Sequence, residues 1–96
     1  MSSTILNVDD HEINRYLRTQ VLRKAGYRVV EAATGEDAIS KCVSEKPSLV
    51  LLDVNLPDMH GTQVCQRIKS DDSLRTFVVH VSATYIGSSD QAVGSR

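Results

Sequence analysis

Three aspartates and one serine stand directly after β-prone runs, where a side chain that leaves a core strand can reach solvent. Asp9 and Asp10 follow TILNV, Asp53 follows the apolar run 49–52, and Ser82 follows FVVHV. Burial of an unpaired carboxylate is costly, and carboxylates that lie together also repel one another. If these strands are parallel neighbours, the acids need either a proton or a bound cation.

An oxygen-only set of ligands predicts Mg²⁺ or a similar ion, which binds through one or two carboxylates and bridges to phosphate oxygen. The D-x-[DN]-x-[DN]-G loop of a calcium site is absent from the sequence. A carboxylate beside such an ion can attack phosphorus and form an aspartyl phosphate, which makes Asp53 the candidate nucleophile. The Ser82 hydroxyl is then placed to donate to the phosphoryl oxygens.

The same side chains also suit simpler structural roles. Acidic residues are common before helix N-termini, and a lone serine is commonly a turn or capping hydroxyl. Three acids at two strand ends, with the loop pattern that follows Asp53, favour the functional interpretation. We expect structural or incidental roles for His11, His60 and His80.

Strands and helices alternate along the sequence. Strands are predicted over 4–8, 27–32, 48–53 and 76–83, and helices over 11–26, 34–45 and 62–70. This order favours right-handed crossovers and a doubly wound parallel sheet with helices on both faces, in which ligands bind at the carboxyl ends of the strands. The apolar run 49–52 predicts a central strand that is covered on both faces.

The first predicted helix carries apolar and basic residues at helical spacing. Its apolar members are Ile13, Tyr16, Leu17, Val21 and Leu22. We expect the basic residues Arg15, Arg18 and Arg23 on the solvated face of this helix.

Length and composition limit the class of protein. At 96 residues the chain has room for one small domain, and its net charge of -1 argues against nucleic acid or an anionic membrane as the main partner. No apolar segment approaches the roughly 20 residues of a membrane span, and the polar start MSST lacks the features of a signal peptide. We therefore expect a cytoplasmic chain in which Cys42 and Cys65 are separate thiols.

Three motifs together carry a resemblance to a known family. VDD at 8–10, LLDVNLPDMHG at 51–61 and HVSA at 80–83 resemble the receiver domain of bacterial two-component response regulators. The resemblance implies a flavodoxin-like sheet with strand order 2-1-3-4 and a receiver domain over residues 1–96. It also implies that Asp53 accepts a phosphoryl group from a histidine kinase or phosphotransfer protein.

The resemblance further assigns roles to the residues around Asp53. It implies that Asp9, Asp10 and Asp53 hold Mg²⁺ with the backbone carbonyl of Asn55. Ser82 matches the hydroxyl residue that moves to the phosphoryl group, and Ala83 matches the small residue beside it. Such a chain catalyses only its own phosphorylation and dephosphorylation.

The sequence departs from the family pattern at its C-terminal end. It stops before the expected fifth strand and helix, the lysine that pairs with the phosphoryl group, and the aromatic switch residue. The four lysines fall elsewhere, at Lys24, Lys41, Lys46 and Lys69. We therefore expect Mg²⁺ binding with impaired or absent switching. We also expect homodimerisation or domain swapping through the exposed edge of the strand 76–83.

Two other functions are compatible with parts of the pattern. A phosphoaspartate-type phosphatase also places an aspartate after a parallel strand, but it typically has a second aspartate two residues later, where this chain has Asn55. A degenerate receiver that serves only as an interaction module fits the missing end, whereas the complete set of three acids opposes it.

Overall fold

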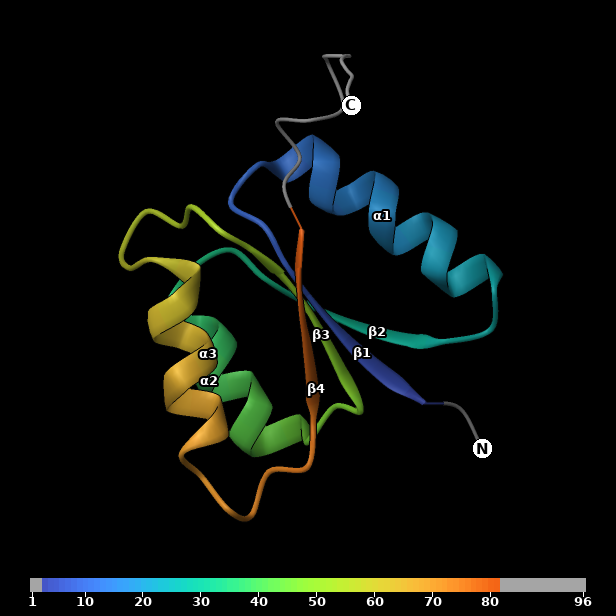
Figure 1. Ribbon diagram of the computed structural model, residues 1–96. Helices are drawn as coiled ribbons and strands as arrows, with labels where there is room; N and C mark the ends of the chain where they lie inside the picture. Colours follow the sequence, from blue (N-terminus) through green and yellow to red (C-terminus); the bar gives the residue numbers. More distant parts are fainter. Residues whose placement is uncertain (1–2, 82–96) are drawn as a thin grey trace, which may run out of the picture.

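The computed structural model describes residues 3–81, which form four strands and three helices (Figure 1). The elements in chain order are β1 (Thr4–Val8), α1 (Glu12–Lys24), β2 (Arg28–Ala32), α2 (Gly35–Glu45), β3 (Leu49–Asp53), α3 (Gly61–Lys69) and β4 (Phe77–Val81). Each lies within a few residues of the element expected from the sequence. None of the helices in residues 3–81 is long and apolar enough to cross a membrane.

The four strands form one parallel sheet in the order β2-β1-β3-β4, which confirms the predicted flavodoxin-like topology. Strand β1 is central and pairs with β2 on one side and with β3 on the other. In this register Val8 lies opposite both Ala32 and Leu52. The first and third strands therefore end at the same edge of the sheet, as the prediction of a shared crevice requires.

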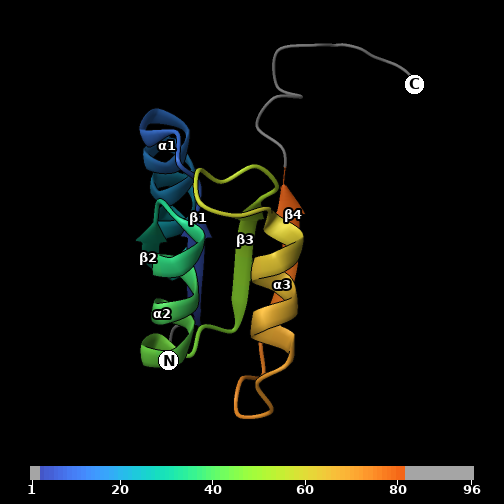
Figure 2. The same ribbon diagram turned by 90° about the vertical axis from the view of Figure 1, so that its left-hand side faces the viewer.

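Helix α1 covers one face of the sheet, and α2 and α3 lie together on the opposite face (Figures 1 and 2). The main core lies between the sheet and the α2/α3 layer. Its buried members are Leu6, Val8, Ala32, Ala38, Cys42, Val50, Leu52, Val64 and Ile68. Alternate residues of β1 and β3 enter this core, since neighbouring side chains of a strand point to opposite faces.

The expected orientation of α1 is wrong for two of its three arginines, whereas Arg23 is exposed, as predicted. The basic residues Arg15 and Arg18 are not on the solvated face, because their side chains are only 17% and 19% exposed and reach buried polar partners. Most of the apolar stripe is exposed instead, and only Leu22 is half-buried. The exposed fractions are 65% for Ile13, 58% for Tyr16, 56% for Leu17 and 67% for Val21.

The physical reason is a polar residue on the facing strand. Asn7 is fully buried in the middle of β1 on the α1 side, where its amide needs hydrogen-bond partners. Helix α1 supplies them with Thr19, Arg18 and the carbonyl of Arg15. The helix therefore turns a polar face toward the sheet.

Strand β3 is central, as predicted, but its two faces are covered unequally. Val50 and Leu52 are fully buried under α2 and α3. Leu49 and Leu51 on the other face are only partly buried and line an apolar groove of about 630 Å³ together with Phe77 and Val79. The prediction of complete cover on both faces is therefore wrong for the α1 side.

Side-chain caps begin all three helices. Thr34 accepts a hydrogen bond from the Asp37 N–H at 3.1 Å, as its position before α2 predicts. His11 and His60 cap α1 and α3 through their rings, which confirms a structural role for both. The thiols of Cys42 on α2 and Cys65 on α3 are both free, which confirms the prediction of separate thiols.

Gly61 and Gly35 offer a matched test of the packing around the loop after Asp53. A Cβ at Gly61 would lie 2.9 Å from the Asp53 carbonyl oxygen and 3.0 Å from the Val54 Cα, so backbone would have to move. A Cβ at Gly35 would meet side chains only, the flexible Met59 and, at 3.0 Å, Cγ2 of the buried Val64. We expect Gly61→Ala to lower the free energy of unfolding by about 1–3 kcal/mol. Gly35→Ala should cost clearly less in the same urea titration, and equal costs would contradict this account.

Candidate functional site

Three carboxylates meet at the carboxyl edge of the sheet. Asp9 and Asp10 directly follow β1, and Asp53 is the last residue of β3. One carboxylate oxygen from each lies within 4.8 Å of the others. Asp9 is buried, Asp53 is half-buried and Asp10 is exposed. The sequence prediction that these three acids share one crevice is confirmed.

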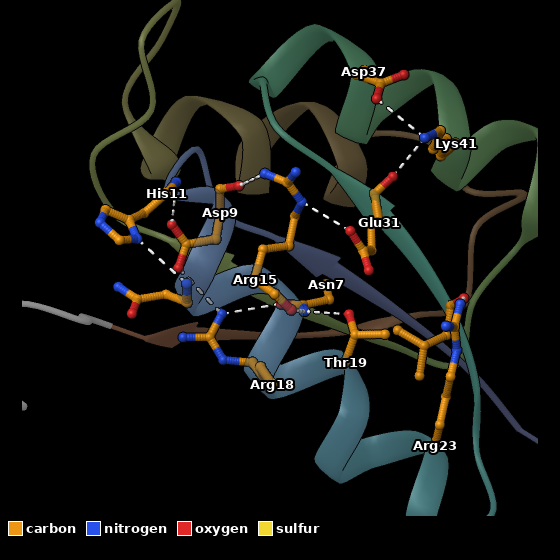
Figure 3. A network of polar contacts seen from close by, with 12 residues as sticks. Asn7, Asp9, His11, Arg15, Arg18, Thr19, Arg23, Glu31, Asp37 and Lys41 are labelled. Carbon is orange, nitrogen blue, oxygen red and sulfur yellow. Dashed lines mark hydrogen bonds and ion pairs between the residues drawn. The ribbon is translucent and has the colours of Figure 1, made fainter.

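Asp9 is held by a partner at each carboxylate oxygen. Its side chain is 1% exposed. Oδ1 accepts a hydrogen bond from the His11 backbone N–H at 2.9 Å, and Oδ2 lies 3.5 Å from Nη1 of Arg18 (Figure 3). The arginine charge offsets the cost of burying this carboxylate. The orientation of Asp9 is therefore set by contacts on both sides.

A second layer of polar residues lies behind Asp9, between β1 and α1 (Figure 3). The Asn7 side-chain N–H group donates at 3.0 Å to Thr19 Oγ1 and at 3.0 Å to the carbonyl of Arg15. Its Oδ1 accepts from Nη1 of Arg18 at 3.0 Å. Sequence reasoning missed this layer, although an asparagine within the β-prone run TILNV was an available signal.

Arg15 connects the same layer to strand β2. Its Nε donates to Glu31 Oε1 at 2.9 Å, and its Nη1 donates to the Asp9 carbonyl at 2.7 Å. Burial acts to raise the pKa of Glu31, but hydrogen bonds from Arg15 and Thr19, with the charges of Arg15 and Arg23, outweigh it and lower that pKa. Arg15 thus fixes the backbone from which the Asp9 side chain extends.

The charged groups that act on Asp53 are negative, whereas Asp9 has the positive charge of Arg18 beside it. Burial raises its pKa against the lowering effect of the hydrogen bond from the Asn55 N–H, and the charges of Asp9 and Asp10 raise it further. The Asn55 N–H donates to Asp53 Oδ1 at 3.3 Å. A carboxylate with a raised pKa gains stabilisation from a proton or a cation. A positive partner would therefore relieve the repulsion that Asp53 experiences from Asp9 and Asp10.

The loop after Asp53 is fastened to α2 by Asp58. Its two carboxylate oxygens accept from the N–H groups of Gly35 at 2.7 Å and Glu36 at 2.9 Å. Sequence reasoning missed this role of Asp58. Asp58 is distant in sequence from Gly35 and Glu36. No local sequence pattern indicated that its loop would lie against the start of α2.

The other predicted site residues have different outcomes. Asn55 lies in the loop beside Asp53, where it is exposed and forms an isolated bridge with His60. Ser82 and Ala83 lie outside the described residues, so their expected places remain predictions. Asp10 is not the cap of α1, because His11 occupies that position.

Comparison with known proteins identifies the family. The family described as "Response regulator receiver domain" matches residues 5–92. The chain belongs to this family. It is 38% identical over 80 residues to sporulation initiation phosphotransferase F of Bacillus subtilis, covering 82% of this chain and 64% of that protein. It is 32% identical over 92 residues to protein PilH of Pseudomonas aeruginosa, covering 96% of this chain and 76% of that one.

Solved receiver structures have the same fold. The structure of chemotaxis response regulator CheY4 of Vibrio cholerae superposes with a TM-score of 0.80 at 27% identity, covering 83% of this chain and 68% of that chain. Receiver domains are signalling modules of two-component systems rather than classical enzymes. The chain spans less than two thirds of the length of the first curated relatives it matches.

Asp58 gives a prediction about how this receiver domain holds its loop. Asp58→Ala removes both acceptors from the N-terminus of α2, whereas Asp58→Asn keeps one acceptor oxygen. We expect the urea midpoint to fall from wild type to the asparagine variant and again to the alanine variant. Asp72→Ala changes an exposed acid in another loop and serves as the control.

The stability that Asp58 contributes should also depend on pH. The hydrogen bonds from Gly35 and Glu36 hold the pKa of Asp58 below its ordinary value. Its carboxylate therefore stabilises the fold above the pKa of the unfolded chain, and that stabilisation is lost as the pH falls through the folded pKa. The gap between wild type and Asp58→Ala should shrink in acid. A gap that is unchanged from neutral to acid pH would contradict this role.

Proposed function

We propose that residues 1–96 are a receiver domain in which Asp53 is the phosphoacceptor. The observation that carries the proposal is the position of Asp53 at the end of a core strand, within reach of two further carboxylates. Burial and the charges of Asp9 and Asp10 raise its pKa, so added positive charge would stabilise its carboxylate. In this proposal Asp9 and Asp10 do not accept the phosphoryl group themselves. They assist its transfer to Asp53 as ligands of the bound cation.

The residues of this site fit a bound Mg²⁺. The potential ligands are carboxylate oxygens from Asp9, Asp10 and Asp53, a donor set that suits a hard divalent cation. The proposal assigns a further ligand to the backbone carbonyl of Asn55. When bound, Mg²⁺ would neutralise negative charge on the transferring phosphoryl group. It would also relieve the repulsion among the three acids.

The chemical step is transfer of one phosphoryl group to Asp53. A carboxylate oxygen attacks phosphorus, a new O–P bond forms, and the bond from phosphorus to the histidine nitrogen of the donor breaks. The electron pair stays on that nitrogen, which can then take up a proton. We assign donation to the phosphoryl oxygens to the Ser82 hydroxyl, with Ala83 beside it as a small residue that leaves space.

The partners follow from this step. We propose that a sensor histidine kinase or a phosphotransfer protein supplies the phosphohistidine, and that the reaction takes place in the cytoplasm. Water later hydrolyses the aspartyl phosphate, so the chain catalyses only its own phosphorylation and dephosphorylation. A receiver that acts solely as an interaction module is the alternative, and the three clustered carboxylates count against it.

Incubation with acetyl phosphate and Mg²⁺ tests the phosphoacceptor directly. We expect an intact mass gain of about 80 Da, the size of one phosphoryl group, which disappears when Mg²⁺ is chelated. Asp53→Asn should abolish the gain, because an amide oxygen is a poor nucleophile toward phosphorus. Asp58→Asn is the matched control in the same loop and should still be labelled.

The outcomes separate the candidate functions. No mass gain in the wild-type chain would support an interaction module and overturn the phosphoacceptor. Labelling that persists in Asp53→Asn would move the acceptor to another residue. Repeated turnover of an external phosphoester would point to a phosphatase.

We also propose that two copies associate through the β4 side of the sheet. In residues 3–81, β4 is an outer strand, and Phe77 and Val79 are 76% and 45% exposed beside the apolar groove. An exposed apolar edge favours pairing with another chain. Light scattering at high concentration should give a mass above the monomer. Phe77→Glu should restore the monomer, and Val43→Glu on α2 should not. A wild-type monomer would contradict the proposal.

A further inference from the structure

A cation of the protein itself lies beside the acidic cluster. Nη1 of Arg18 is 3.5 Å from Asp9 Oδ2 and 3.0 Å from Asn7 Oδ1 (Figure 3). Both acceptors are buried, and the Arg18 side chain is only 19% exposed. Among residues 3–81, Arg18 is the basic residue that forms an ion pair with one of the three clustered acids. Arg18 thus brings a positive charge to a site that otherwise contains three negative ones.

Contacts behind Arg18 hold this charge in place. Asn7 uses its oxygen to accept from Arg18, while its N–H group donates to Thr19 and to the Arg15 carbonyl. Asn7 is therefore bonded on both sides and cannot turn without losing a buried hydrogen bond. An arginine on an open surface would move freely, but this one is fixed by a buried and satisfied partner.

The fixed charge has opposite effects on the two states of the site. Without a metal ion, Arg18 stabilises Asp9 and reduces the repulsion among the three carboxylates. A divalent cation that enters the cluster must approach the same carboxylate and is repelled by the guanidinium. The wild-type site is consequently more stable when empty and less attractive to a cation than three acids alone.

We propose that Arg18 is a positioning residue that acts as the internal counter-ion of the acidic cluster and thereby lowers its affinity for Mg²⁺. The inference rests on the proposed metal site and adds a residue that sets how tightly that site binds. Asn7 has the supporting role, since it fixes the guanidinium between α1 and β1.

Calorimetric titration with Mg²⁺ tests the inference on the whole chain. Arg18→Gln removes the charge and keeps a polar side chain with N–H donors. We expect it to bind Mg²⁺ roughly tenfold more tightly than wild type, a change equivalent to about 1.4 kcal/mol. Without metal the variant should unfold at a lower temperature, and Mg²⁺ should raise its unfolding temperature more than it raises that of wild type.

Two further variants separate charge from structure. Arg18→Lys retains the positive charge, so its Mg²⁺ affinity should stay within about threefold of the wild-type value. Arg23→Gln is the matched control on the same helix, because Arg23 donates to the Val29 carbonyl and not to the acids. Its Mg²⁺ affinity should be unchanged. A residue that only supported the fold would alter the unfolding temperature of Arg18→Gln and leave its Mg²⁺ affinity unchanged.

The wild-type chain provides a readout that does not depend on a folded variant. The guanidinium N–H resonance of Arg18 should shift in NMR spectra as Mg²⁺ saturates the site, while that of Arg23 stays in place. An unshifted Arg18 resonance, or equal or weaker Mg²⁺ binding by folded Arg18→Gln, would overturn the role of Arg18 while leaving the metal site intact. Absence of Mg²⁺ binding in both wild type and Arg18→Gln would overturn the metal site and this inference together.

Discussion

The parallel register of β1 with β3 is the constraint on which the site depends. Val8 lies opposite Leu52, and both side chains are fully buried under the α2/α3 layer. A slip of one residue would turn these side chains to the other face of the sheet. The apolar core therefore fixes the register, and the register brings Asp9, Asp10 and Asp53 out at one edge.

The three acids that meet there are stabilised in different ways. Asp9 is buried and is held by Arg18 and by the His11 N–H. Asp10 is exposed, so water screens its charge. Asp53 is half-buried beside both, and the pKa of its carboxyl is raised by burial and by its neighbours. The cluster therefore combines a buried and positioned acid, a solvated acid, and an acid whose pKa is raised by its surroundings.

Helix α1 is attached to the sheet largely by polar contacts, unlike α2 and α3, whose buried faces are apolar. The cause is Asn7, which brings an amide into the middle of the central strand. Because α1 turns a polar face inward, most of its apolar residues are left on the outside. The helix that begins closest to the acids therefore combines a buried polar layer with an exposed apolar surface.

The sequence by itself determined the alternation of strands and helices, the parallel sheet and the meeting of three acids at its edge. These follow from short-range periodicity and from the rule that parallel strands end at one edge. Only the tertiary structure decided which face of α1 points inward, because both its apolar stripe and its arginines were compatible with helical spacing. It also decided that Arg18 pairs with Asp9 and that Asp58 accepts hydrogen bonds from the first N–H groups of α2. Those contacts join residues on different elements, and their energies depend on distance and burial, which local sequence does not specify.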